Sequence, residues 1–133
     1  MQISAVVTSS SSGYDATVAT GGTSQSLAIP AKPLGPGSAV SGGEFLMLAL
    51  ATCYCNDLYR EARRLGISLQ GAQVEASAEF DGVGLAARNI QYKASVQSTA
   101  SPRDIARLLR ETDAVAEVHN TVRAGAPVQL LLA

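Results

Sequence analysis

Two cysteines, Cys53 and Cys55, are the residues of this chain best suited to covalent chemistry. A cysteine reacts as its thiolate, and a low thiol pKa needs a nearby cation or a helix N-terminus. Cys53 is expected in the middle of a helix, where the helix dipole contributes little. Two interpretations therefore stand: a reactive thiolate, or a buried core thiol of the kind that is usually inert.

Cys55 follows two residues later, which is about 200° round a helix. The two thiols then point to opposite sides, so a disulfide between them would break the helix. Pairing across a dimer is geometrically open, but two independent core thiols are the favoured interpretation. This spacing suits a loop rather than a helix for zinc, so no metal or cofactor site is predicted.

Three further side chains could act on a thiol at Cys53. His119 is the only histidine; it is either the base that activates the thiol or, as is favoured, a surface or capping residue without a catalytic role. Glu44 stands three residues after Ser41, and this capping-box spacing alone explains it. Asp57 lies one helical turn after Cys53, where its charge would raise the thiol pKa.

The element that must position these residues is a central helix, Glu44 to Leu65. Its first half, from Phe45 to Ala51, is apolar on every side and is expected to be buried all round. Its second half turns amphipathic and ends at Gly66. The inner stripe is expected to hold Leu58, Tyr59, Ala62 and Leu65, and the exposed side Asn56, Asp57, Arg60, Glu61, Arg63 and Arg64.

The remaining elements are strands and two short helices. Alternation predicts strands at 1–8, 14–19, 23–29, 72–80 and 90–96, with a long loop at 30–43. Ser101 and Pro102 begin one helix and Thr112 opens another, while Val128 to Leu132 is predicted as a last strand. The order β-β-β-α-β-β-α-α-β predicts an α+β fold with a mostly antiparallel sheet wrapped around the long central helix.

Length and composition limit the functional classes. The 133 residues fit one domain, 1–133, and charged residues make up only 16% of them, below the ~25% that is usual. So few charges favour burial against a second copy. The net charge of −1 suggests neither a nucleic-acid nor a membrane partner. With no secretory signal or apolar span in view, the chain is predicted to be cytoplasmic.

The segment GGEFLMLALATC, residues 42–53, resembles the central-helix motif of the OsmC/Ohr family. Gly66 and Ile67, Val74 in the next strand and the closing AEVHNTVRAGAPV at 116–128 continue the match. The resemblance implies an intertwined homodimer and peroxiredoxin-like, thiol-dependent reduction of organic hydroperoxides in oxidative stress. In active members of the family a central-helix cysteine attacks the peroxide, a second cysteine resolves it, and an arginine and a glutamate activate the thiolate.

Carried onto this chain, the family motif assigns the attacking thiol to Cys53. Glu44 is near the glutamate position but stands one residue closer to the cysteine than is usual. No arginine precedes Arg60, and the region of the resolving cysteine holds Val118, His119 and Asn120. Arg60 and the arginines after it could instead supply the missing cation to a partner subunit.

Two functions therefore stay open. The first is a hydroperoxide reductase with Cys53 as nucleophile and an external dithiol or intersubunit thiol as reductant. The second is a catalytically degenerate dimer that binds a small apolar ligand at its interface.

Overall fold

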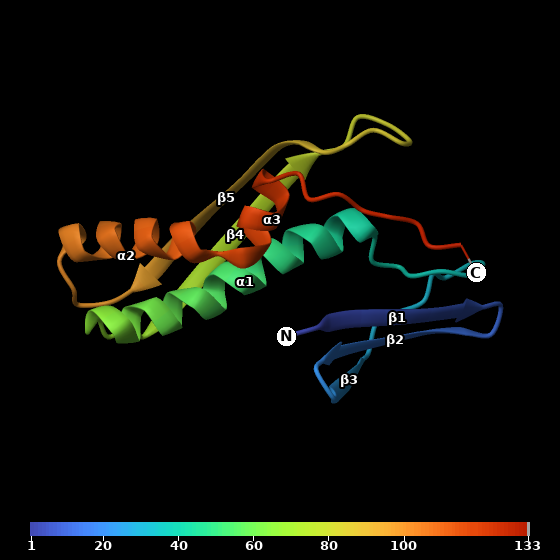
Figure 1. The fold of residues 1–133 in the computed structure, drawn as a ribbon, viewed down its shortest axis with the longest axis horizontal. Coiled ribbons are helices and arrows are strands. Elements are labelled where there is room, and N and C mark those ends of the chain that lie inside the picture. Colours follow the sequence, from blue (N-terminus) through green and yellow to red (C-terminus); the bar gives the residue numbers. More distant parts are fainter. Residues whose placement is uncertain (133) are drawn as a thin grey trace. The chain divides into compact units, whose positions relative to one another are not determined.

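The computed structural model describes residues 1–132 as a mixture of antiparallel sheets and helices (Figure 1). It divides into two compact units, Met1–Phe45 and Leu46–Ala133, and each is described here by itself. The predicted α+β class is confirmed. That residues 1–133 form a single domain stays a prediction.

The first unit is a three-stranded antiparallel meander. It contains β1 (Ile3–Ser10), β2 (Gly13–Thr20) and β3 (Thr23–Leu27), with β2 in the middle. Gly21 takes a φ of 59°, the left-handed conformation that a tight hairpin turn requires. These strands agree with the alternation of the sequence.

Helix α1 (Gly42–Leu65) begins with the predicted capping box. The backbone N–H of Glu44 donates to Ser41 Oγ at 3.1 Å, and the N–H of Ser41 donates to Glu44 Oε1 at 3.3 Å. The helix ends at Gly66, whose φ is 71°. No helix among residues 1–132 is long and apolar enough to cross a membrane.

The second unit packs helices on one face of a two-stranded sheet (Figure 1). Strands β4 (Gly71–Glu79) and β5 (Arg88–Gln97) pair antiparallel. Their even-numbered side chains turn toward α1 and α2 (Pro102–Val115). The buried residues at the centre of this core are Tyr54, Leu58, Ala62, Leu108 and Ala116.

The burial of α1 differs from the prediction in its second half. Asp57 and Glu61 were expected to be exposed, but their exposed fractions are 4% and 7%, whereas Tyr59 is 43% exposed. Tyr54, Asp57, Leu58, Glu61 and Ala62 follow the i, i+3, i+4, i+7, i+8 spacing of one helix face, so the two acids lie on the buried stripe. Arg60 and Arg64 pair with them and keep their guanidinium groups half exposed.

The first half of α1 is also less buried than predicted. Leu48 is 57% exposed and Ala49 is exposed as well, although Leu50 is buried. Exposed apolar side chains of this kind are common at surfaces that are covered in an assembly.

Two predicted elements near the C-terminus are wrong. Thr112 does not open a helix; it lies inside α2, fully buried, and its hydroxyl donates to the carbonyl of Leu108 at 2.7 Å. The next helix, α3 (Glu117–Arg123), begins only after Ala116. Val128 to Leu132 form no strand, because no described strand pairs with them, and their side chains are exposed. The observed order is β-β-β-α-β-β-α-α.

Candidate functional site

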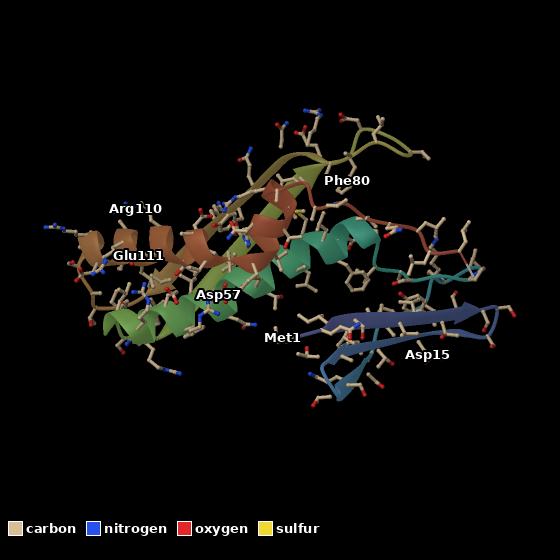
Figure 2. All side chains as sticks on the ribbon, viewed as in Figure 1. Met1, Asp15, Asp57, Phe80, Arg110 and Glu111 are labelled. Carbon is tan, nitrogen blue, oxygen red and sulfur yellow. The ribbon has the colours of Figure 1, made fainter. Side chains whose placement is uncertain are left out.

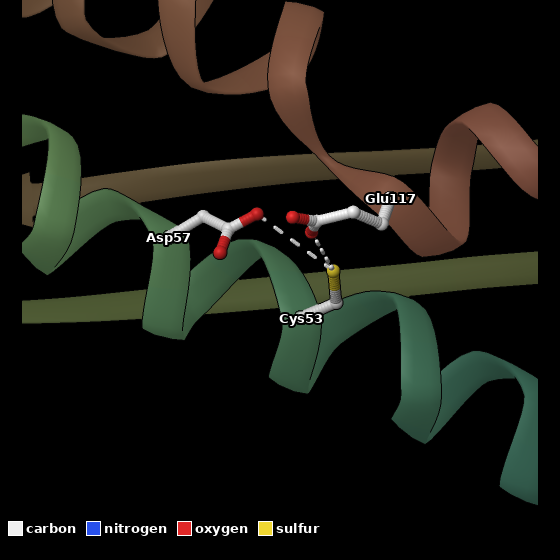
Figure 3. A group of neighbouring side chains, drawn as sticks. All are labelled: Cys53, Asp57 and Glu117. Atoms are coloured by element: carbon white, nitrogen blue, oxygen red, sulfur yellow. Dashed lines mark hydrogen bonds between the residues drawn. The ribbon is translucent and has the colours of Figure 1, made fainter. Parts of the chain in front are cut away.

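The Cys53 thiol lies between two carboxylates (Figure 3). Its Sγ lies 3.8 Å from Asp57 Oδ2 and 3.8 Å from Glu117 Oε2, so the single S–H can donate to either carboxylate. We call these three residues the thiol–carboxylate cluster. Asp57 comes from the next turn of α1 (Figure 2), whereas Glu117 is the first residue of α3.

The local fold explains why α3 begins next to Cys53. Ala116 is fully buried in the core and is extended, with φ −73° and ψ 103°, so it separates α2 from α3. The chain therefore turns at the core surface, and the first residues of α3 meet α1 there. Cys53 itself is half buried and packs against the same core.

Asp57 is a buried carboxylate with one close cation. Arg60 Nη1 lies 2.8 Å from Asp57 Oδ1, one turn further along α1. Burial raises the pKa of Asp57; the charge of Arg60 lowers it in part, and Glu117 adds to the rise. The Asp57 carboxyl is therefore a better proton acceptor than an exposed aspartate.

The surroundings of Cys53 favour its protonated form. Burial raises the pKa of the Cys53 thiol, the backbone N–H of Val118 lowers it, and the charges of Asp57 and Glu117 raise it further. The net shift is upward, which confirms the predicted effect of Asp57. Cys53 is thus a thiol at rest, and its reaction requires a group that accepts its proton.

The cluster also offers three atoms of metal-ligating type. Cys53, Asp57 and Glu117 each present one such atom, and these atoms lie within 4.8 Å of one another. In the structure they are satisfied by hydrogen bonds to one another and by the ion pair with Arg60. The geometry by itself therefore assigns no metal ion to them.

Cys55 takes no part in the cluster. Both cysteines are free and half buried, so they form no disulfide with each other. This agrees with the opposite directions that helical spacing gives them.

His119 lies in a second group, which we call the aromatic cluster: Tyr54, Tyr92 and His119. The His119 ring is only 3% exposed, and its centroid lies 4.4 Å from that of Tyr92 and 5.8 Å from that of Tyr54. Neither ring nitrogen has a hydrogen-bond partner among the described residues. Burial lowers the pKa of His119, and the charge of Arg123 lowers it further, although Asp113 and Asp57 act in the opposite direction.

Hydrogen bonds fix the tyrosines of the aromatic cluster. Tyr54 donates its hydroxyl to the carbonyl of Leu109 at 2.8 Å, and Tyr92 donates to Asp113 Oδ1. Arg123 Nη2 lies 2.6 Å from the same Asp113 oxygen. These contacts join α1, β5, α2 and α3, so they hold α3 and with it Glu117.

The three predicted site residues are thus placed differently. Cys53 is in the thiol–carboxylate cluster, and His119 is in the aromatic cluster without a hydrogen bond to the thiol. Glu44 belongs to the first unit, where its carboxylate caps α1. His119 is buried between two tyrosine rings, so the favoured interpretation of His119 as a surface or capping residue is wrong. The catalytic roles of Glu44 and His119 stay predictions.

Glu117 is the one member of the thiol–carboxylate cluster that the sequence did not single out. It stands in the segment AEVHN, two residues before His119, at the region expected for the resolving cysteine. This position was the signal that could have pointed to Glu117. The contact itself spans 64 positions, so it depends on the packing of α3 and could not be read from the sequence.

A family model described as OsmC-like protein matches residues 35–131. The chain belongs to the OsmC-like family. The resemblance noted in the sequence is thereby confirmed as family membership. Among the curated proteins, none matches this OsmC-like chain.

Solved structures agree with the OsmC-like fold. An OsmC-like protein from Mycoplasma pneumoniae aligns with a TM-score of 0.63 at 19% identity, covering 92% of this chain and 86% of that one. An organic hydroperoxide resistance protein OsmC from Legionella pneumophila aligns at 0.61 and 16% identity, covering 92% and 90%. An organic hydroperoxide resistance protein from Elizabethkingia anophelis aligns at 0.62 and 16%, covering 92% and 89%. At these identities the likeness shows the fold alone.

Proposed function

We propose that this OsmC-like protein reduces organic hydroperoxides through the thiol of Cys53. The observation that carries the proposal is the pair of carboxylates within hydrogen-bond distance of Sγ, since they can accept the proton that the thiol must lose. The names of the Legionella and Elizabethkingia neighbours, both hydroperoxide resistance proteins, support the same class of reaction.

The reaction leaves a sulfenic acid at Cys53 and releases an alcohol. The only other cysteine, Cys55, points to the opposite side of α1, and it cannot resolve the sulfenic acid of the same chain. An external dithiol therefore returns Cys53 to the thiol through a mixed disulfide. Such a cycle belongs in the cytoplasm, where thiols are kept reduced.

We also infer that two copies of the chain associate. Large apolar side chains are exposed in both units, as is common at surfaces that are covered in an assembly. They include Ile3, Val6, Val7, Leu34, Leu48, Val83 and Leu85. A dimer mass in light scattering at micromolar concentration is expected, and a monomer would contradict this inference.

The test of the proposed reaction is consumption of an organic hydroperoxide with a dithiol reductant. Wild type and Cys55→Ser are expected to turn over, while Cys53→Ser is expected to lose activity. Cys55→Ser is the matched control, because it removes a thiol of similar burial from the same helix. Equal rates in Cys53→Ser and wild type would overturn the assignment of Cys53.

A second candidate is a family member without peroxidase activity that binds a small apolar ligand. It is favoured by the raised pKa of Cys53 and by an open hollow of about 580 Å³. Tyr54, Tyr92, Ala94 and Leu109 line this hollow together with the charged residues Lys93, Arg110 and Asp113. Under this alternative, hydroperoxide is not consumed, and the fluorescence of an apolar, environment-sensitive probe rises on binding. Rapid turnover that depends on Cys53 would contradict it.

A further inference from the structure

We propose that Asp57 and Glu117 together form a proton shuttle, which takes the proton of the Cys53 thiol and delivers it to the departing alkoxide of the hydroperoxide. This inference rests on the proposed function and deepens it, because it gives Asp57 and Glu117 named roles in the reaction of Cys53. It also accounts for two acidic groups beside a thiol that is expected to react as an anion.

The geometry provides the path for the proton. Sγ lies 3.8 Å from one oxygen of each carboxylate, and the three atoms lie within 4.8 Å of one another (Figure 3). The carboxylates come from different elements, α1 and α3, so they approach the sulfur independently. Glu117 is exposed, and its side chain can reach a substrate that enters from solvent.

The negative charges around Cys53 disfavour a stable thiolate. They favour a protonated thiol that passes its proton to a neighbouring carboxylate as it reacts. Cys53 faces Asp57 and Glu117, while the guanidinium of Arg60 pairs with Asp57. From α3 the backbone N–H groups of Glu117 and Val118 favour the thiolate in part. Burial raises the pKa of Asp57, which brings it closer to the operating pH at which general bases work best.

The step balances without a further reactant. The sulfur attacks the terminal oxygen of the hydroperoxide, so an S–O bond forms and the O–O bond breaks. The sulfur is oxidised to sulfenic acid, and the peroxide is reduced to an alcohol. The thiol proton passes to a carboxylate and then to the alkoxide, and the carboxylate is regenerated.

Two reagents with different leaving groups distinguish a proton shuttle from carboxylates that only repel the thiolate. An alkoxide is a strong base that needs a proton as it leaves, whereas the iodide released from iodoacetamide needs none. Removing a carboxylate that only repels the thiolate raises both rates. Removing a proton shuttle raises the rate of alkylation and lowers the rate of peroxide reduction.

The experiment measures both rates in a Cys55→Ser background, so that Cys53 is the only thiol. Glu117→Gln removes one carboxylate of the shuttle, and Asp57→Asn removes the other from a different element. The matched control is Glu75→Gln, on the exposed face of β4, where Glu75 pairs with Lys93. Single-turnover formation of sulfenic acid with tert-butyl hydroperoxide is followed by a diketone trap, and alkylation by iodoacetamide is followed at the same pH.

Glu117→Gln is expected to alkylate severalfold faster at pH 7 and to form sulfenic acid about tenfold more slowly than the parent. Glu75→Gln is expected to match the parent in both assays. A parallel rise of both rates in Glu117→Gln and Asp57→Asn would overturn the shuttle, while sulfenic acid formation by the parent would still support Cys53 as the nucleophile. A parent protein that forms no sulfenic acid would overturn both, and the two failures are thus distinct.

Discussion

The thiol–carboxylate cluster and the aromatic cluster differ in how their polar atoms are satisfied. In the first, the thiol lies within hydrogen-bond distance of two carboxylates, and a guanidinium pairs with one of them. In the second, a histidine is almost completely buried between two tyrosine rings and neither of its nitrogens is bonded among the described residues. The first is therefore suited to proton transfer, and the second to packing.

One short helix supplies a member to each cluster. Glu117 and His119 are two residues apart on α3, which separates their directions by about 200°. The aromatic cluster thus fixes the orientation of α3, and this orientation places Glu117 beside Cys53. The comparison teaches that the packing of one residue on a short helix, His119, can determine where a neighbouring residue, Glu117, lies.

The largest effect is expected from breaking the aromatic cluster at Tyr54. Its side chain is 2% exposed, contacts both other rings and donates to Leu109. Tyr54→Ala is expected to lower the free energy of unfolding by about 3–5 kcal/mol, as for other buried aromatic truncations. Urea denaturation followed by circular dichroism measures the loss.

The control for Tyr54 is the same substitution five residues further along α1. Tyr59 lies on the exposed side of the helix, so Tyr59→Ala is expected to cost about 1 kcal/mol or less. Equal losses at the two positions would mean that the aromatic cluster does not hold this unit together.

A smaller effect is expected from removing Arg60, the ion-pair partner of Asp57 in the thiol–carboxylate cluster. Arg60→Ala leaves the buried carboxylate of Asp57 without its cation, but the guanidinium is half exposed, so the loss is about 1–2 kcal/mol of unfolding free energy. The Asp57 charge then acts unscreened on the thiol, and the pKa of Cys53 is expected to rise further. Iodoacetamide alkylation across pH measures this rise.

Arg63→Ala is the matched control, because Arg63 is exposed on the same turn of α1 and makes no ion pair among the described residues. It is expected to leave the alkylation profile unchanged. The same profile in both variants would show that Arg60 does not act on Asp57 and Cys53.

The sequence predicted the elements well where a local pattern determines them. The capping box at Ser41 and Glu44, the end of α1 at Gly66 and the start of α2 at Ser101 all depend on residues within one turn, and all are confirmed. The alternation in β4 and β5 gave both strands and the face they turn to the core. Such features need no knowledge of distant contacts.

Prediction failed where packing decides. Asp57 and Glu61 have the charge of surface residues, yet they lie on the face of α1 that packs into the core, and arginine partners make this tolerable. The strand predicted at 128–132 is apolar enough but has no described neighbour to pair with. Glu117 could not be placed beside Cys53, because that contact depends on the turn at Ala116 between α2 and α3.

The smallest effect is expected from protonating His119. Its folded pKa lies below the unfolded value of about 6.5, so the unfolded chain takes up the proton more readily. Its contribution to stability is therefore complete above that pH and is lost as the pH falls below it. Urea midpoints between pH 7.5 and 5.5 measure the loss, which is expected to be smaller than the loss in Tyr54→Ala or Arg60→Ala.

His119→Phe keeps a ring between the tyrosines without a titrating group, so the difference between wild type and this variant isolates the effect of His119 from that of the carboxylates. A wild-type midpoint that falls no more than that of His119→Phe would mean that the imidazole finds a partner for its proton, contrary to its unbonded nitrogens in the aromatic cluster.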